Sequence, residues 1–299
     1  MIVTRLADVE PRARRVAMGT FDGMHLGHRE VVKGADTVLT FDPHPRTIID
    51  RAGAPRLLTP LRRKAELLAE LGVEELVVIA FDAAFAARSA QSFHDDILVG
   101  SLGATHVQVG ENFRYGARAA GDAELLLADG RFDVSVVPLL EVDGEIVSSS
   151  HIRGLVAGGA LEYAGVLLGS AFSMAGEVVH GDARGRTLGY PTANLVPDAA
   201  YVSPAHGVYA CRVQLPGGGA PVAAATNVGV RPQFVTGRGE LVEAFLIDWA
   251  GDLYGQEIRI DFLKRLRGEK RFDSVGALVD QMAADVADAR GLASVPGRQ

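Results

Sequence analysis

The sequence predicts an α/β domain with a parallel sheet, followed by a small antiparallel β-barrel with a terminal helix. Before about residue 170, short apolar segments alternate with segments of helical periodicity, the pattern of βαβ units. After it, strand-like runs are separated by turns rich in Gly and Pro. A chain of 299 residues is long enough for two domains, and we expect them at 1–168 and 169–299.

Strands and one helix are expected in the first half. The segment TPLRRKAELLAELG predicts a helix, with Thr59 as N-cap, Pro60 in the first turn and Gly72 just beyond the end. The expected strands are RVAMGTF (15–21), DTVLTF (36–41), LVVIAF (76–81) and THVQVG (105–110).

The second half predicts antiparallel strands and a final helix. The segment DSVGALVDQMAADVADAR (273–290) predicts an amphipathic helix whose acidic and amide positions face solvent. Its expected apolar face is Val275, Leu278, Val279, Met282 and Val286. The expected strands are YACRVQL (209–215), VAAATNVGV (222–230), LVEAFLIDW (241–249) and EIRIDFL (257–263).

Composition excludes several classes of protein. No apolar run approaches the roughly 18–20 residues of a membrane span, and charge interrupts the N-terminus too early for a secretory signal, so we expect a cytoplasmic protein without membrane association. Cys211 is the single cysteine, which excludes an internal disulfide framework and indicates a core position. The net charge is −7 and neither half is basic, which disfavours nucleic-acid binding but is compatible with a local pocket for a phosphorylated ligand.

The stretch GTFDGMHLGH (19–28) carries the first chemical signal. Its glycines follow an apolar strand and precede a helical segment, which places His25 and His28 near a helix N-terminus that favours an anion. Histidines three apart share a helix face and can reach one ligand. Zinc is disfavoured because the H-E-x-x-H spacing and its glutamate are missing. The residues alone leave open a phosphate site and an ordinary turn.

Together with TFDPHP (40–45), GENFRYG (110–116) and SSSHIR (148–153), this stretch resembles the adenylyltransferase domain of the bacterial bifunctional riboflavin kinase/FAD synthetases. The resemblance implies a Rossmann-like nucleotidyltransferase domain. It also implies that His25 and His28 are catalytic and stabilise the ATP phosphates while the phosphate of FMN attacks the α-phosphorus.

The same resemblance implies further binding residues. His44, between two prolines, is expected to shape the flavin or nucleotide pocket, and Asp22 either orders the turn or contacts Mg²⁺ through water. Read without its neighbours, SSSHIR favours a helix N-cap followed by a surface arginine over an ATP contact. The implied ATP- and phosphate-binding residues are Gly19, Asp22, Gly23, Asn112, Ser149, Ser150 and Arg153.

One segment departs from the family. Only REVVKGADTVLT (29–40) separates His28 from Phe41, about half the usual length, so we expect a helix of about two turns ending at Gly34. This short helix motivates an alternative in which the N-terminal domain binds nucleotide or flavin without turnover.

The stretch GEVVHGDARGRTLGYPTANL (176–195) carries the second chemical signal. It is not a P-loop, because three residues instead of four separate Gly181 from Gly185 and an arginine follows. Its glycines and its arginines, Arg184 and Arg186, are compatible with a phosphate-binding loop or a mobile surface loop.

This stretch closely resembles the riboflavin kinase signature, and GVYA (207–210), TNVGVRP (226–232), EAFLIDWAGDLYG (243–255) and RLRGEKRFDS (265–274) follow in family order. The resemblance implies a small barrel that transfers the ATP γ-phosphate to the riboflavin 5′-hydroxyl. Thr192 and Asn194 would hold Mg²⁺ with ATP, Glu243 would be the catalytic base, and Arg267 would lie near the flavin. The implied phosphate-binding residues are Gly181, Arg184, Gly185, Arg186, Thr192 and Asn194.

The alternation of side chains along a strand is a second reason to expect a functional role for Glu243. It places this carboxylate in one row with Phe245, Ile247 and Trp249, where it would be costly without a partner or a purpose. The alternative is a strand-end glutamate paired with an arginine. For Arg267 the alternative is a surface basic cluster. Gln233 stands where the family typically has threonine, near the expected flavin pocket.

These motifs predict a bifunctional enzyme that converts riboflavin to FMN and FMN to FAD with Mg²⁺ and ATP. The expected partners are riboflavin, FMN and ATP, and the chain is expected to be a monomer or a weak oligomer. The alternatives are a monofunctional riboflavin kinase with a degenerate N-terminal domain and a non-catalytic flavin-responsive binding protein. A tRNA-charging role is weaker still, because nothing supplies a tRNA-binding surface.

Overall fold

The computed structural model describes residues 1–181, 185, 188–230 and 240–293. The chain divides into two compact units, Met1–Ser149 and Ser150–Gln299. The domain boundary expected at residues 168/169 stays a prediction. The segment before it forms α7 (Ser149–Gly158) and α8 (Leu161–Leu168), and α8 packs against strands of the second unit.

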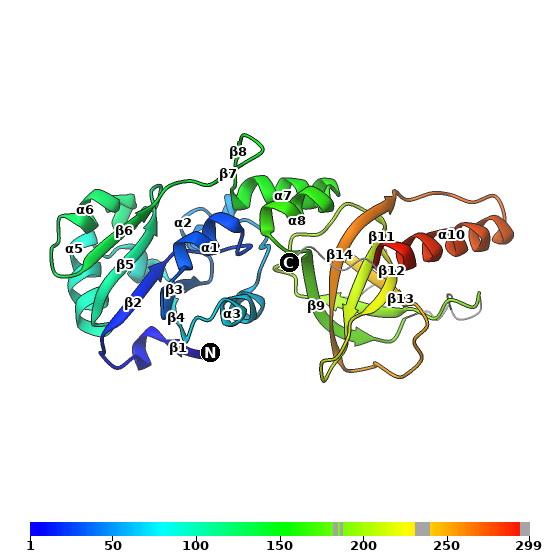
Figure 1. Ribbon diagram of the computed structural model, residues 1–299, viewed down its shortest axis with the longest axis horizontal. Coiled ribbons are helices and arrows are strands. Elements are labelled where there is room, and N and C mark those ends of the chain that lie inside the picture. Colours follow the sequence, from blue (N-terminus) through cyan, green and yellow to red (C-terminus); the bar gives the residue numbers. More distant parts are fainter. Residues whose placement is uncertain (182–184, 186–187, 231–239, 294–299) are drawn as a thin grey trace. The chain divides into compact units, whose positions relative to one another are not determined.

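The first unit is built on a parallel sheet with strand order β1-β4-β3-β2-β5-β6 (Figure 1). Every strand expected from the sequence is present, and the edge strands β1 and β6 are additional. The strands are β1 (Ile2–Arg5), β2 (Arg14–Met18), β3 (Thr37–Asp42), β4 (Glu75–Ala80), β5 (Ala104–Gly110) and β6 (Asp133–Val137).

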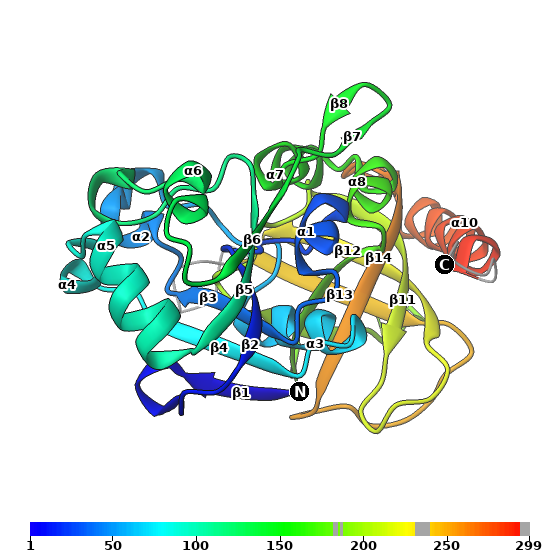
Figure 2. The ribbon, with the colours of Figure 1, turned by 60° about the vertical axis from the view of Figure 1, so that its left-hand side comes forward.

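Helices cover both faces of this sheet (Figure 2). Successive strand residues point to opposite faces: Ala17 packs with α1 (Leu26–Val32) and α3 (Leu61–Glu70), and Val16 packs with the π-helix η3 (Phe93–Ser101) and α6. The shorter elements are η1 (Leu6–Asp8), α2 (Arg46–Ile49), η2 (Arg51–Gly53), α4 (Ala83–Ala86), α5 (Ala90–Ser92), η4 (Ala117–Ala119), α6 (Ala123–Leu127), β7 (Glu141–Val142) and β8 (Glu145–Ile146).

The helix ends agree with the sequence except at one position. Helix α1 has about two turns and Gly34 follows it with φ +78°, and Gly72 follows α3 with φ +84°, as expected. The expectation that Thr59 caps α3 is wrong, because Pro60 is the N-cap residue. The Thr59 hydroxyl instead accepts a hydrogen bond from the backbone N–H of Gly23 at 2.7 Å.

The second unit is a closed antiparallel barrel with strand order β10-β13-β12-β11-β14-β9. Its core contains Tyr209, Phe172 and Phe262, and Cys211 is fully buried as expected, which raises the pKa of its thiol. The strands are β9 (Phe172–Val179), β10 (Ala193–Pro197), β11 (Gly207–Gln214), β12 (Val222–Val230), β13 (Glu240–Leu246) and β14 (Glu257–Arg267).

The terminal helix α10 (Val275–Ala293) packs against the barrel largely with the expected face, because Val286 lies in the cluster between helix and barrel and Leu278, Val279 and Met282 are half-buried. Asp285 is buried, whereas Val275 is 65% exposed. The expectation that the acidic and amide positions face solvent is therefore wrong for Asp285, which accepts a hydrogen bond from the half-buried Gln281, whereas Asp280 and Asp288 are exposed as expected. No helix in the described part of the chain combines the length and hydropathy needed to cross a membrane.

Closure of the barrel between β9 and β10 predicts that Gly176→Ala destabilises the protein. A Cβ at Gly176 would lie 2.3 Å from the carbonyl oxygen of Val196 on the neighbouring strand, so the strands would have to separate. We expect a loss of about 1–3 kcal/mol in the free energy of unfolding, measured by urea denaturation. Gly154→Ala is the matched control, because its Cβ would meet nothing within 4 Å. Equal stability of the two variants would contradict the prediction.

Candidate functional sites

A cavity of about 750 Å³ lies at the carboxyl ends of the parallel strands. Gly19 follows β2 and Gly110 ends β5, and both line this cavity. Because the chain continues from β2 to β3 on one side and β5 pairs with β2 on the other, the order of the sheet reverses here. Open α/β sheets bind ligands at this kind of reversal.

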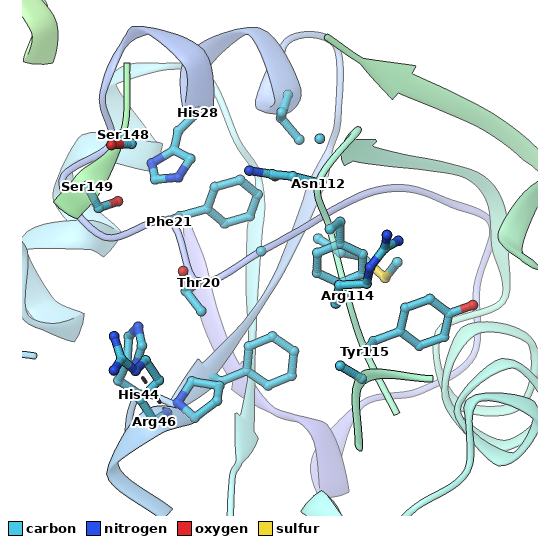
Figure 3. A pocket seen from close by; sticks show the side chains of 18 of the residues that line it. Thr20, Phe21, His28, His44, Arg46, Asn112, Arg114, Tyr115, Ser148 and Ser149 are labelled. Carbon is cyan, nitrogen blue, oxygen red and sulfur yellow. Dashed lines mark hydrogen bonds between the residues drawn. The ribbon is translucent and has the colours of Figure 1, made fainter. Parts of the chain in front are cut away.

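Both polar and aromatic side chains line the cavity. His28, Ser148 and Ser149 lie on one side and Arg114 and Tyr115 on the opposite side (Figure 3). His25, His44 and Asn112 also line it, as does Gly19, so the cavity brings together many of the expected residues. The aromatic lining includes Phe41, Phe81, Phe85, Phe93, Phe113 and Tyr115.

The two histidines form a stacked pair. Their ring centroids are 3.5 Å apart with an interplanar angle of 18°, and the backbone N–H of His28 donates to Nδ1 of His25 at 3.3 Å. Burial lowers the pKa of His25 to about 4 and holds the pKa of His28 well below its usual value, with the charges of His25 and Lys64 adding to the effect at His28. Both rings are therefore neutral near pH 7 and act as N–H donors.

The Asp22 carboxylate orders the turn. It is 1% exposed and accepts the backbone N–H groups of Leu58 and Thr59, each at 2.9 Å. The Ser149 hydroxyl donates to the carbonyl oxygen of Asp22 at 2.8 Å. Neither Asp22 nor Gly23 is among the described residues that line the cavity. Their direct contact with ATP stays a prediction, and the structure favours the turn-ordering role for Asp22.

Lys64 is a buried cation that sequence reasoning missed. Its Nζ donates to the carbonyl oxygen of Thr20 at 2.6 Å and to the hydroxyl of Thr40 at 3.2 Å. Burial lowers the pKa of this amine to about 8, although the charges of Asp22 and Asp42 oppose the effect. Its burial could have been predicted from the helical spacing, because Lys64 lies three residues after Leu61 and four before Leu68, on the buried face of α3.

The remaining expected residues of this half are placed as follows. His44 accepts the backbone N–H of Arg46 at Nδ1, 3.2 Å away, which fixes the ring at the cavity (Figure 3). Ser150 and Arg153 belong to α7 in the second unit, where the Arg153 guanidinium donates to the Ser150 hydroxyl at 3.3 Å. Their contact with ATP stays a prediction.

A second cavity, of about 820 Å³, lies on the barrel. Asn194, Glu243 and Asn227 face one another in register on the adjacent strands β10, β13 and β12, and all three line this cavity. Sequence reasoning missed Asn227, although it lies within the quoted motif TNVGVRP. Tyr190 and Phe245 line the cavity with their rings edge to face at 5.1 Å.

Glu243 lies on the cavity face, but its row is shorter than expected. Leu241 and Phe245 share this face and line the cavity with it. Strand β13 ends at Leu246, so the expected continuation of the row through Ile247 and Trp249 is wrong. Ile247 instead packs in the cluster between the barrel and α10.

A buried ion pair holds Arg267 at the wall of the cavity. The Asp285 carboxylate accepts Nε and Nη2 of Arg267 at 2.8–3.1 Å, and Gln281 donates to the same carboxylate at 3.0 Å. The guanidinium lies 5.7 Å from the centre of the Phe272 ring. The Arg267 side chain is only 21% exposed, which argues against the alternative that it belongs to a surface basic cluster.

Comparison with known proteins assigns the family. The FAD synthetase family matches residues 8–151 and the riboflavin kinase family matches residues 168–293. A bifunctional riboflavin kinase/FMN adenylyltransferase of Escherichia coli (strain K12) is 40% identical over 92% of this chain and 91% of its own. One of Bacillus subtilis (strain 168) is 36% identical over 94% and 93%. The chain belongs to the bifunctional riboflavin kinase/FMN adenylyltransferase family.

The fold of this chain is also similar to that of a solved structure. The crystal structure of a protein from Streptococcus pneumoniae, described as a macrolide-efflux protein, superposes with a TM-score of 0.87 at 31% identity. The match covers 97% of this chain and 99% of that chain.

The donor set of the barrel cavity fits a magnesium ion. Asn194 is 4% exposed, and its Oδ1 has no hydrogen-bond partner among the described residues. Thr192 lines the same cavity, and side-chain oxygens suit a hard cation. A Cβ on Gly181 would lie 2.4 Å from the Asn194 amide, and one on Gly185 would lie 2.2 Å from the Tyr190 carbonyl oxygen, so both positions require glycine. Arg184, Arg186 and Gln233 lie outside the described residues.

The neutral state of His25 predicts a pH dependence of stability. Its pKa is about 4 in the folded protein, against an ordinary value of 6.5 in the unfolded chain. The unfolded chain therefore binds more protons between these values, and stability falls as the pH falls. Between pH 7 and 5.5 this group should cost about 1 kcal/mol. His25→Gln should lose less stability than the wild type over this range in urea unfolding followed by circular dichroism. Equal losses in both proteins would refute the prediction.

Proposed function

We propose that the cavity of the first unit transfers AMP from ATP to FMN, and that the barrel cavity transfers the γ-phosphate of ATP to riboflavin. The observation that carries this proposal is that each cavity combines a polar part suited to phosphates with aromatic side chains suited to a flavin. The protein then makes FMN and FAD, and the family relationship supports both activities.

In adenylyl transfer, a phosphate oxygen of FMN forms a bond to the α-phosphorus of ATP while the bond to the pyrophosphate oxygen breaks. Negative charge moves to the leaving pyrophosphate. His25 accepts a backbone N–H at Nδ1, so in the neutral ring its proton lies on Nε2 as a donor. Nδ1 of His28 is buried without a partner among the described residues. Phosphate oxygens would accept hydrogen bonds from these rings, and fixed donors stabilise the transition state.

The short helix α1 does not remove the groups this step requires. His25, His28, Asn112 and Ser149 all line the cavity around the β2–α1 turn. Asp22 and Thr59 hold that turn by hydrogen bonds that do not depend on the length of α1. We therefore favour a working adenylyltransferase over the alternative of a degenerate N-terminal domain.

In phosphoryl transfer, Glu243 accepts the proton of the riboflavin 5′-hydroxyl while that oxygen bonds to the γ-phosphorus and the bond to ADP breaks. Asn227 and Asn194 flank Glu243 on the neighbouring strands and orient the reacting groups. Thr192 and Asn194 would hold the Mg²⁺ of this cavity, which would neutralise charge on the phosphates of the ATP bound there. Arg267, fixed by Asp285, would contact the flavin.

Product assays with separated flavins test the proposal. The wild type should convert riboflavin to FMN and FAD with ATP and Mg²⁺, and EDTA should stop both steps. Glu243→Gln should reduce FMN formation about 10²–10⁴-fold because the base is lost, and should leave FAD formation from added FMN intact. His28→Asn is the matched reciprocal variant, in which only FAD formation falls. Retained FMN formation in Glu243→Gln would contradict the role of Glu243 as the catalytic base. Wild-type protein that forms FMN but no FAD would favour the monofunctional alternative.

The buried pair predicts a specific effect of Asp285→Asn. The amide cannot balance the Arg267 charge, so the guanidinium would leave its position at the cavity wall. We expect the KM for riboflavin to rise about tenfold while the KM for ATP stays within about twofold. Asp280→Asn, an exposed position on the same helix, is the control and should change neither constant. A parallel rise of both constants in Asp285→Asn would argue against this role for Arg267.

A further inference from the structure

A buried hydrogen-bonded chain leads away from the adenylylation cavity. Nε2 of His94 lies 2.5 Å from the Tyr115 hydroxyl, and Nδ1 of His94 lies 2.5 Å from a carboxylate oxygen of Asp129. Arg131 donates to both oxygens of Asp129 at 2.6 and 2.7 Å. Tyr115 lines the cavity, whereas His94 and Asp129 lie behind it. The adenylylation mechanism above uses none of these residues.

The chain sets the direction of the Tyr115 hydroxyl. The Arg131 hydrogen bonds hold the pKa of Asp129 well below its usual range, so this carboxylate only accepts. In the neutral ring, Nδ1 of His94 then donates to Asp129 and Nε2 accepts the Tyr115 O–H. Figure 3 shows this hydroxyl directed away from the other labelled cavity residues. Burial also raises the pKa of Tyr115, which keeps the phenol as a donor.

The Tyr115 ring is held on several sides. It stacks with Phe113 at 5.6 Å and 18°, and Tyr115 and Gly121 exchange backbone hydrogen bonds of 3.1 and 2.9 Å. A Cβ on Gly121 would lie 2.5 Å from the Tyr115 ring, so the opposing position requires glycine. The ring is thereby kept at the wall of the cavity.

His94 occupies an unusual element. It lies in η3, a π-helix, where Phe93 and His94 are both buried, followed by Ile97 and Leu98. The backbone N–H of Leu102 donates to the carbonyl of Ile97, five residues earlier, at 2.9 Å. Segments of this type are rare in proteins and are often found at functional sites. Here the element presents Phe93 to the cavity and His94 to Tyr115 from adjacent positions.

We propose that His94 and Asp129 are positioning residues for FMN: they hold the Tyr115 hydroxyl outside the cavity, so that only the aromatic ring faces the flavin. This inference rests on the proposed adenylylation of FMN in this cavity. Without His94, the hydroxyl is a buried donor without its partner, and the Tyr115 ring then shifts from its place at the wall to bring this polar group toward the flavin.

Steady-state kinetics of FAD formation tests the inference with a double-mutant cycle. His94→Leu should raise the KM for FMN about tenfold, with kcat and the KM for ATP within about twofold of the wild type. Tyr115→Phe should raise the KM for FMN less than His94→Leu does, because it removes the hydroxyl and keeps the ring. The double variant should return toward the wild-type value, since both polar partners are gone.

His106→Leu is the matched control, because His106 also makes a side-chain hydrogen bond, to Ser135 at 2.9 Å, but does not line the cavity. It should leave every constant unchanged. If His94→Leu does not fold, Asp129→Asn breaks the chain at the next bond and takes its place in the cycle.

Three results would overturn the inference. They are an unchanged KM for FMN in His94→Leu, a double variant no better than His94→Leu, and a parallel rise of the KM values for FMN and ATP that indicates general loosening. Wild-type protein that forms no FAD from FMN and ATP would instead refute the proposed function, so the two failures are distinguishable.

Discussion

A buried carboxylate must have partners for its charge, and this constraint determines how both sites are held. Asp22 meets it with the backbone N–H groups of Leu58 and Thr59, which ties the histidine turn to the start of α3. Asp129 meets it with His94 and Arg131, behind the aromatic wall. Asp285 meets it with Arg267 on the barrel. Because breaking such a pair leaves an uncompensated charge, each carboxylate fixes the geometry of its surroundings more firmly than apolar packing alone.

The order of the main strands could be read from the sequence because local pattern encodes it. Apolar runs such as 76–81 and the turn residues around 216–219 mark strands and loops without knowledge of their neighbours. The edge strands β1 and β6 were not predicted, since their exposed and half-buried residues lack a continuous apolar run, and the barrel strands β9 and β10 were not predicted either. The row from Glu243 was extended too far, because the sequence does not show that β13 turns after Leu246.

The sites could be predicted only as far as their motifs. His25, Asn112 and Glu243 line cavities, and their roles stay predictions. The neutral state of the histidine pair could not be read from spacing, because it results from burial by distant segments. Asp285 was read as solvated because its partner lies 18 residues earlier on a strand. Thr59 was read as a cap because Asp22, its partner, lies 37 residues away. Local periodicity carries no information on such pairings.

The closed barrel restricts how this sequence can diverge. Asn194, Glu243 and Asn227 occupy one row across three strands, and successive strand residues alternate between the cavity and the core. Substitutions at the exposed ends of these strands leave the row intact, whereas insertion or deletion of one residue within β13 would replace Glu243 by a core residue, Val242 or Ala244. With no open edge to absorb a slip of register, length changes are confined to the loops, and the strands are expected to retain fixed lengths throughout evolution.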